Sequence, residues 1–479
     1  MTPRSFDAAP AQRSRIASAA LLSLTLLAGC ASLNPQARFE PIQAQTQTLL
    51  KQDLQWARTP EQRAALDARV AELLATPLTV DRAVQVALLN HRGLQAQLHQ
   101  LGIADAALVQ ATRLPNPGFS LGRLKRGDEL EIERGLHFNL MSLLTSSTRG
   151  RVAELDAQLL QRELGQQVLK VAADARRAYW MALAAQQLQQ YSQQVMEAAE
   201  AGADLAQRMA AVGNLSKLKQ AREQSFYADA ALGLAHAEIE TLARREALVR
   251  ALGLWGPQLA RLTLPERLPD LPAQAIDRPE VERLAIQQRL DVQEAKKAAE
   301  ASAAQMGLSR STRFINVLEL GWVSNRSNHD PTQTGFELSL ELPLFDWGEA
   351  RVAHAEARYM QALERTAHVA ITARSEAREA YAQYRSAFDI ARHYRDEVVP
   401  LRKRISDENL LLYNGMFIGT FELLADARAQ ISAVAAAIAA QRDFFVAEAD
   451  LNQALLGPLT AAASSAAPMS TAAEASGGH

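Results

Sequence analysis

An alternation of apolar and polar residues in the segment 335–348 restricts the possible folds of this chain more than any other feature. The apolar positions are Phe336, Leu338, Leu340, Leu342 and Leu344. The positions between the first four of them are occupied by Glu337, Ser339 and Glu341. Because successive side chains of a β-strand point to opposite faces, the pattern predicts a strand over 335–345 with an apolar face and an acidic face. A membrane-spanning strand needs about ten such residues, with Phe336 and Leu340 toward lipid and Glu337, Ser339 and Glu341 toward a water-filled lumen.

Half-buried strands of soluble sheets show the same alternation, so the strand alone does not decide between the two environments. A long alanine-rich helical pattern begins directly after Gly348. A small sheet domain has no use for such a helix, whereas a pore with a helical extension does. The combination of strand and helix therefore favours the membrane.

The N-terminal residues have the pattern of a bacterial export signal. Arg13 and Arg15 precede a short apolar run that ends in Leu27-Ala28-Gly29-Cys30. This ending resembles a lipobox, which implies that 1–29 is a lipoprotein signal peptide and that Cys30, the only cysteine, becomes the first mature residue and carries lipid such as palmitate. By the same resemblance, Ala31 after the cysteine favours the outer membrane. An ordinary cleaved signal is the alternative.

The rest of the chain repeats one order of elements twice: helix, two strands, long helix, turn and returning helix. In the first half these elements are predicted at 78–113, 119–126, 129–144, 149–212 and 215–252. In the second half they are predicted at 277–311, 313–324, 335–345, a long helix after Gly348 that Pro400 should kink, and 421–456. The predicted domains are a tether at 30–77 with one helix at 61–74, a first repeat at 78–256, a Pro-rich connector at 257–279, a second repeat at 280–457 and a tail at 458–479.

Four strands are too few to close a membrane barrel, because the smallest membrane barrels need about eight. An open edge in lipid would leave backbone N–H and C=O groups without partners. The chain must therefore oligomerise if its strands enter a membrane, and three copies would supply about twelve strands, an even number. The predicted fold is mainly α with a transmembrane β-barrel part, in which a trimeric barrel of about twelve strands is continued by a long α-helical barrel.

Several short motifs follow one another in a fixed order along both repeats. They are the lipobox at Cys30, Leu114-Pro115-Asn116-Pro117, Arg289-Leu290-Asp291, Leu342-Pro343-Leu344-Phe345-Asp346-Trp347-Gly348, and Tyr413-Asn414-Gly415 with Phe421-Glu422-Leu423-Leu424. Together they resemble the outer-membrane efflux factors of the TolC family, in its lipoprotein branch. The resemblance implies a homotrimer in the outer membrane that extends into the periplasm. It would dock on a periplasmic adaptor and an inner-membrane pump of the RND type, as the exit of a tripartite exporter.

By the same resemblance, the turns at the far ends of the two helical hairpins meet the adaptor. The residues expected there are Gly213, Asn214, Leu215 and Ser216 in the first hairpin and Gly415, Met416, Phe417, Ile418 and Gly419 in the second. Met416, Phe417 and Ile418 would form an exposed apolar patch, which independently favours a partner. Ordinary turn geometry that needs glycine is the alternative.

The resemblance also places a constriction just beyond the second turn. Glu422 and Asp426 lie one helical turn apart, and threefold symmetry would arrange their carboxylates as a ring that favours cations. Arg404 and Arg428 are the expected partners that hold the aperture shut, and Tyr413 belongs to the same region. A solvated helix face is the alternative for this group of residues.

The sequence contains no catalytic constellation, no helical pair of histidines that would bind zinc and no glycine-rich phosphate-binding loop. We therefore expect no enzyme, cofactor or metal site, and the energy for transport would come from the partner pump. A net charge of −2 gives no argument for nucleic acid. The predicted function is a passive outer-membrane duct that exports small molecules or metal ions. The alternatives are a lipid-anchored periplasmic coiled-coil scaffold without a channel, and the outer-membrane duct of a type I protein-secretion system.

Overall fold

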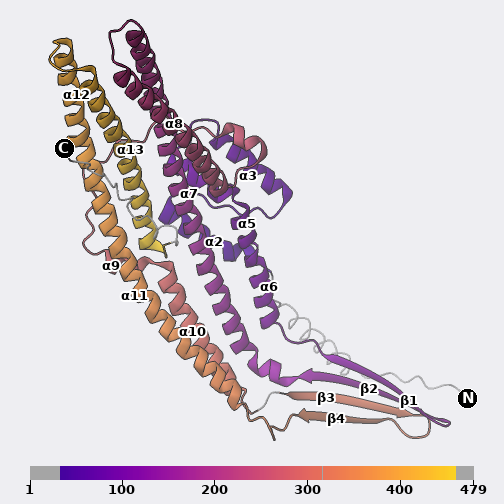
Figure 1. Ribbon diagram of the computed structural model, residues 1–479. Coiled ribbons are helices and arrows are strands. Elements are labelled where there is room, and N and C mark those ends of the chain that lie inside the picture. The colour runs from indigo at the N-terminus through magenta and orange to yellow at the C-terminus, as the bar shows by residue number, and fades with distance from the viewer. Residues whose placement is uncertain (1–32, 315–316, 460–479) are drawn as a thin grey trace, which may run out of the picture. The chain divides into compact units, whose positions relative to one another are not determined.

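The computed structural model describes residues 33–314 and 317–459. The predicted signal peptide, Cys30 and the tail from residue 460 lie outside these ranges. The described residues form many helices and one four-stranded sheet (Figure 1). The described residues divide into two compact units: 33–38 with 101–160 and 297–363, and 39–100 with 161–296 and 364–459. Each unit draws segments from both predicted repeats.

The first unit contains the sheet. Its strands are β1 (Gly118–Arg126), β2 (Glu129–Asn139), β3 (Leu318–Ser327) and β4 (Gln333–Leu340), which run antiparallel in the order β1-β2-β3-β4. The pairing of β2 with β3 joins the two repeats. Gly127 turns β1 into β2 with a φ of 62°, a left-handed conformation that glycine adopts without steric cost. At the same end, Asn328 donates a hydrogen bond to the Asp128 carbonyl at 2.9 Å and accepts one from the Leu130 N–H at 2.8 Å, which ties the two hairpins together.

Three predicted strand boundaries are wrong. β4 ends at Leu340 rather than 345, so Glu341 lies beyond the strand. Pro343 has no N–H to donate to a ladder, and the chain turns around it, since the Leu344 N–H donates to the Leu342 carbonyl at 2.8 Å. β2 ends at Asn139 rather than 144. The Asn139 side chain accepts a hydrogen bond from the Ser142 N–H at 2.7 Å and so caps a helix that begins at Leu140. β3 occupies Leu318–Ser327 rather than 313–324, because its last residues continue the ladder with β2.

The long helices form two hairpins, as the repeat predicts. α7 (Leu140–Ala211) is followed by α8 (Lys217–Leu252), and α11 (Glu349–His393) and α12 (Val399–Asn414) are followed by α13 (Thr420–Leu456). A π-helical turn, Tyr394–Val398, joins α11 to α12, and in it the Val399 N–H donates to the Tyr394 carbonyl. This turn directly precedes Pro400, whose missing N–H breaks the regular hydrogen-bond series. The long helix is therefore irregular where Pro400 predicted a kink.

The core of the second unit is built from small residues and a few aromatic rings. Ala373, Ala377 and Ala380, in the alanine-rich helix predicted after Gly348, are at most 1% exposed, so this face of α11 packs closely in the core. The rings of Trp180 and Phe445 stack with their centroids 4.5 Å apart. Tyr179 donates a hydrogen bond to the Leu78 carbonyl at 2.9 Å, and burial raises the pKa of its hydroxyl to about 12. This core holds α7, α11 and α13 together.

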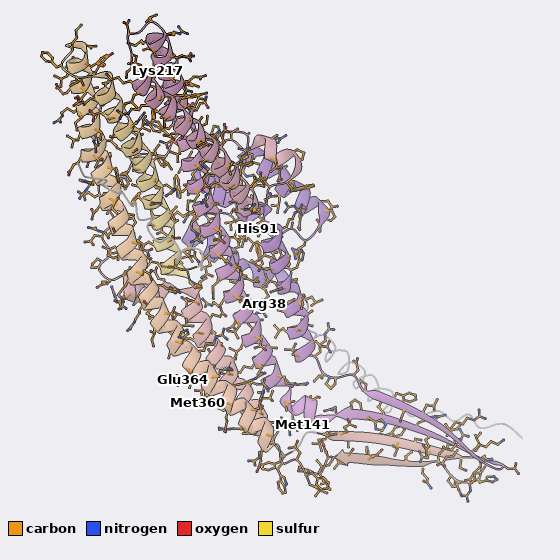
Figure 2. All side chains as sticks on the ribbon, in the orientation of Figure 1. Arg38, His91, Met141, Lys217, Met360 and Glu364 are labelled. Atoms are coloured by element: carbon orange, nitrogen blue, oxygen red, sulfur yellow. The ribbon has the colours of Figure 1, made fainter. Side chains whose placement is uncertain are left out.

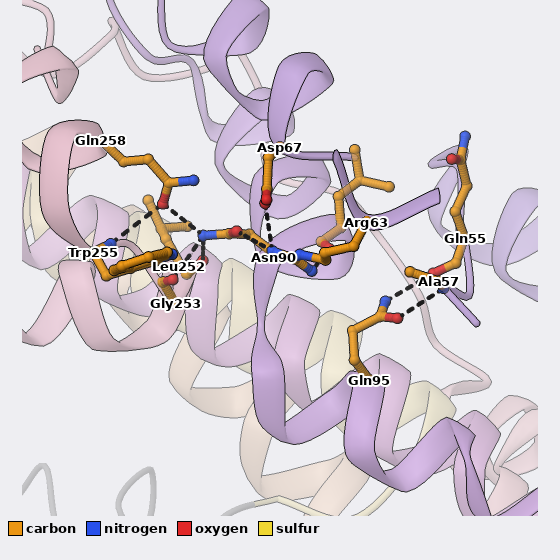
Figure 3. A network of polar contacts seen from close by, with 11 residues as sticks. Gln55, Ala57, Arg63, Asp67, Asn90, Gln95, Leu252, Gly253, Trp255 and Gln258 are labelled. Carbon is orange, nitrogen blue, oxygen red and sulfur yellow. Dashed lines mark hydrogen bonds and ion pairs between the residues drawn. The ribbon is translucent and has the colours of Figure 1, made fainter. Parts of the chain in front are cut away.

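The helix predicted at 78–113 is broken into α4 (Val80–Asn90), α5 (Arg92–Leu98) and α6 (Gln100–Thr112). Asn90 explains the first break, because it is fully buried and needs polar partners. Its side-chain amide donates to the Gly253 carbonyl at 2.6 Å and to Gln258 at 3.1 Å, and accepts from Arg63 at 2.8 Å (Figure 3). His91 then accepts the Leu94 N–H and begins α5.

The helix predicted at 277–311 is likewise broken, into α9 (Val281–Gln288) and α10 (Leu290–Ser311). The break falls at Arg289, whose side chain is completely buried. Its guanidinium binds both carboxylate oxygens of Asp291, an oxygen of Glu376 at 2.7 Å and the Ala454 carbonyl. The motif Arg289-Leu290-Asp291 thus has a structural role: it connects the start of α10 to α11 and α13 in the second unit.

The predicted tether contains two helices rather than one. α3 (Pro60–Leu73) confirms the helix predicted at 61–74, and a capping box between Thr59 and Gln62 begins it. α2 (Pro35–Leu50) was not predicted, because Pro41 and its many glutamines look like loop composition. Its apolar residues Phe39 and Ile42 are nevertheless buried, so this segment packs as part of the fold. Within the described ranges, no helix has an 18-residue stretch apolar enough to cross a bilayer.

Candidate functional site

The two faces of the sheet differ sharply in chemistry. Residues that pair across an antiparallel sheet share a face, so the register gives the members of each face directly. Phe119, Leu136, Trp322 and Phe336 form one continuous row across all four strands. The next row is Phe138, Leu320 and Leu338, followed by Leu318 and Leu340. We call this the apolar face; it is open to the surroundings, and Phe336 is 82% exposed.

The opposite face, called the polar face below, carries every carboxylate of the strands. Its acidic residues are Glu129, Glu131, Glu133, Glu319 and Glu337. The predicted lumen residues Glu337 and Ser339 lie on this face, as the alternation requires, whereas Glu341 falls outside β4. The sheet therefore has an acidic face opposite an apolar one. This arrangement suits a wall between lipid and an aqueous space that favours cations.

His137 lies flat across the polar face between two glycines. Its Nε2 is 3.0 Å from the Ser120 hydroxyl oxygen. A Cβ at Gly135 would lie 2.8 Å from Nε2, and a Cβ at Gly321 would lie 3.0 Å from Nδ1. The two glycines thus make room for the imidazole ring. Glycine inside an alternating strand is the sequence signal for such an arrangement.

The edges of the sheet are open. Among the described residues, β1 and β4 each pair with a neighbouring strand on one side only. Each therefore presents a row of backbone N–H and C=O groups that a further strand can take up. A second copy of the chain could supply that strand, since the free edges of β1 and β4 are those that a closed ring would bring together.

The first hairpin tip has the turn that its glycine predicts. Gly213 has a φ of 80°, and the Asn214 N–H donates to the Met209 carbonyl at 2.9 Å, so the end of α7 is closed by a glycine in the left-handed region. Ser216 caps α8 by accepting the Lys219 N–H, and Lys217, labelled in Figure 2, is the first residue of that helix. Leu215 completes the connection.

The second hairpin tip turns at a different residue from the one expected. Gly415 has an ordinary right-handed backbone, and Met416 takes the left-handed conformation with a φ of 61°. The Phe417 N–H donates to the Leu412 carbonyl at 2.9 Å. Met416 and Phe417 are 92% and 81% exposed, whereas Ile418 is half-buried and Gly419 precedes α13. The predicted apolar patch is therefore present as two side chains.

The residues predicted to form a constriction are not joined within one chain. Glu422 is exposed and Asp426 is half-buried on α13. Among the described residues, neither forms an ion pair with Arg404 or Arg428, and Tyr413 makes no side-chain hydrogen bond. Arg428 instead lies over the Phe226 ring at 4.3 Å and approaches the Arg222 carbonyl at 3.5 Å. In the described part of the chain, Arg428 thus fastens α13 to α8.

Glu223 belongs to this contact and was missed from the sequence. It is only 8% exposed, and burial raises the pKa of its carboxyl, while the charge of Arg428 opposes that shift. A glutamate in a helix rich in Lys, Arg and Gln looks solvated, so no local signal marks it. The two hairpins therefore meet near their tips through one buried carboxylate and one arginine.

No group of three or more His, Cys, Asp or Glu side chains in the described part of the chain is placed to hold a metal ion. The strongest polar cluster of the first unit is structural. Arg38, labelled in Figure 2, binds both carboxylate oxygens of Glu154 at 2.7 and 2.8 Å, and the Asn34 N–H donates to Asp105 at 2.7 Å. These contacts fasten the start of α2 beside α6 and α7.

No model of a known protein family matches the chain. Solved structures match it over most of its length. The open-state MtrE outer membrane channel of Neisseria gonorrhoeae aligns with a TM-score of 0.65, at 18% identity, over 79% of this chain and 89% of that one. The CmeC outer membrane channel of Campylobacter jejuni aligns with a TM-score of 0.61, at 16% identity, over 84% of this chain and 89% of that one. The chain has the fold of the outer-membrane efflux channels.

One curated relative of this chain is the cobalt-zinc-cadmium resistance protein CzcC of Cupriavidus metallidurans. The two sequences are 23% identical over 296 residues, which cover 59% of this chain and 66% of CzcC. The predicted fold class is confirmed.

Proposed function

We propose that this chain is one subunit of the exit duct of a tripartite exporter in the outer membrane. Three copies would pair β4 of one with β1 of the next and close a barrel of about twelve strands, and their helical hairpins would continue the duct. The duct conducts passively and is not an enzyme, since an inner-membrane pump supplies the energy. The observation that carries the proposal is the sheet with one apolar face, one acidic face and two open edges.

The cargo proposed is small molecules or metal ions, with cations preferred. The carboxylates on the polar face of the sheet would line the lumen, and acidic walls raise the local concentration of cations. The name of CzcC connects that relative to resistance against cobalt, zinc and cadmium. Both observations support divalent cations as part of the cargo of this duct.

The proposed partners are a periplasmic adaptor and an inner-membrane pump, reached through the hairpin tips. Met416 and Phe417 expose apolar side chains on a backbone turn that also strains Met416, a combination that a soluble monomer has no reason to keep. Gly213 to Ser216 would form the second half of the contact. Glu422 and Asp426, just behind the tip, remain the proposed constriction.

The proposed lipid anchor is Cys30. It would become the first residue after cleavage of a signal peptide at 1–29. Cys30 itself lies outside the described residues. Asn34 and Arg38 are held in the unit that contains the sheet by their contacts with Asp105 and Glu154. A lipid attached a few residues earlier would therefore leave from the same unit that the proposal inserts into the membrane.

Conductance across a planar bilayer tests the proposal. Purified full-length protein should give stable, cation-selective steps, whereas a periplasmic scaffold would give none. Glu337→Gln should lower the cation-to-anion permeability ratio, because its side chain lies on the polar face within β4. Glu341→Gln is the matched control, since Glu341 lies beyond the strand and should change the ratio less. Absence of conductance in the unaltered protein would refute the duct.

A further inference from the structure

The apolar face changes its chemistry toward the end of the sheet that carries the strand connections 127–128 and 328–332, called the loop end. Four basic residues take the outward positions there: Arg123, Lys125, Arg134 and Arg326. The register places Arg123 opposite Ile132, Ile132 opposite Arg326, and Arg134 opposite Leu121. All four therefore lie on the same face as Phe119 and Trp322, and we call them the basic rim.

The charges of the strands are separated by face. The apolar face contains these four basic residues and no acidic one, whereas the polar face contains all five glutamates of the strands and a single arginine, Arg126. A solvated sheet would mix the two signs on both faces to keep its charges paired. The separation favours an anionic environment for the apolar face at its loop end.

The basic side chains are available for a ligand. Arg123, Lys125, Arg134 and Arg326 are all exposed, and in the described ranges none of them donates a hydrogen bond or forms an ion pair. The nearest carboxylates of the loop end outside the strands are Asp128 and Asp330, which lie in the connections. Guanidinium groups in this state are good binders of phosphate, because they offer two parallel N–H donors.

The order of residue types along the apolar face matches the depth of a lipid leaflet. Arg326 and Trp322 are four residues apart on β3, a distance of about 13 Å along a strand. Beyond Trp322 the face stays apolar to Leu340, and at the other end of the sheet Phe345 is 99% exposed and Trp347 is exposed as well. A basic rim, an apolar band and aromatic residues in succession place the rim at the level of the lipid headgroups.

We propose that the basic rim binds the phosphate groups of phosphorylated lipid headgroups in the leaflet that surrounds the loop end, of the lipid A type. The proposal rests on the proposed function, because the apolar face meets lipid only when the sheet is in a membrane. Apolar residues would hold the acyl chains, while Arg123, Arg134 and Arg326 would clamp the phosphates. In a trimer this surface would repeat around the barrel and stabilise its outer end.

Retention of lipid by the full-length protein tests the proposal. The protein would be reconstituted in nanodiscs of phosphatidylcholine with a minor fraction of bis-phosphorylated lipid A, and the lipid A retained after detergent extraction counted by mass spectrometry. The triple variant Arg123→Gln, Arg134→Gln, Arg326→Gln should retain at least about tenfold less lipid A than the unaltered protein. Each charge-assisted contact is worth a factor of that order in affinity. Lipid A without its phosphates should be retained no better by the unaltered protein than by the variant.

Arg126→Gln is the matched control, because Arg126 lies at the same end of β1 on the polar face. It should retain lipid A as the unaltered protein does. The proposal would be overturned if the triple variant retained as much lipid A as the unaltered protein, or if Arg126→Gln lost as much lipid A as the triple variant. It would also be overturned if the unaltered protein retained lipid A equally well with and without its phosphates. Conductance separates the two claims. If the unaltered protein conducts but the triple variant keeps its lipid A, the duct function holds and only lipid binding by the basic rim is refuted.

Discussion

Glu223 on α8 is a buried carboxylate without a hydrogen-bonding partner of its own among the contacts described, and only the charge of Arg428 offsets its burial. Burial raises its pKa in the folded chain above the ordinary value of 4.5. The folded chain therefore binds the proton more tightly than the unfolded chain. The contribution of Glu223 to the free energy of unfolding is full below pH 4.5 and falls as the pH rises through the folded pKa.

Glu223→Gln should accordingly raise the thermal midpoint at pH 8 and change it little at pH 4, where the carboxyl is protonated in both states. Thermal unfolding followed by circular dichroism at the two pH values measures this. Glu238→Gln, an exposed position on the same helix, is the control and should move neither midpoint. A midpoint that rises equally at both pH values would show that the charge of Glu223 is not the cause.

Single residues also show where the sequence is informative. The period of two in 335–345 identifies the faces of Glu337 and Ser339 correctly, because alternation is a property of the strand itself. It extends too far, to Glu341, because Pro343 ends the ladder before the alternation stops. Arg428 and Glu223 meet across two helices that are far apart in the chain, and nothing in either local sequence indicates the other.

Among the elements, the turn between α12 and α13 combines strain with exposure. A non-glycine residue in the left-handed region costs about 1–2 kcal/mol, and Met416 occupies it with a φ of 61° although Gly415 stands beside it. Glycine at the turn residue would be the more stable choice. The retained methionine fits a surface that a partner covers.

Met416→Gly should therefore raise the thermal stability of the hairpin, by about 1 kcal/mol, while it weakens binding to the periplasmic adaptor. Gly213→Ala provides a control of opposite sign, because Gly213 has a φ of 80° and a Cβ there introduces the strain that Met416→Gly removes. Thermal unfolding and retention of adaptor on immobilised protein measure the two effects. A less stable Met416→Gly protein would contradict the assignment of strain.

The elements were predictable in kind and order, but not in their interruptions. The long helices and the strand pairs follow from periodicity, which each segment carries by itself. The breaks at Asn90 and Arg289 depend on partners supplied by distant segments, such as Gly253 and Glu376. Asn139 has a local signal, since an amide that precedes a helical pattern is a typical cap, and the strand prediction overrode it.

For the whole molecule, the sheet is the incomplete part. A sheet of four strands with an apolar face open to the surroundings and two free edges cannot be stable in lipid alone, because its edge groups would remain without hydrogen bonds. The chain shares its fold with outer membrane channels at TM-scores of 0.61 and 0.65. In the proposed trimer, one chain would contribute a third of the wall of the duct.

The stoichiometry of the purified protein tests this claim most directly. Native mass spectrometry of full-length lipidated protein released from detergent micelles should give one dominant species with three times the mass of the processed chain. Leu338→Pro removes a backbone N–H from β4 that a neighbouring strand would need, so it should convert that species to monomer, while the unaltered protein treated in the same way keeps it. A monomer as the dominant species of the unaltered protein would contradict the account.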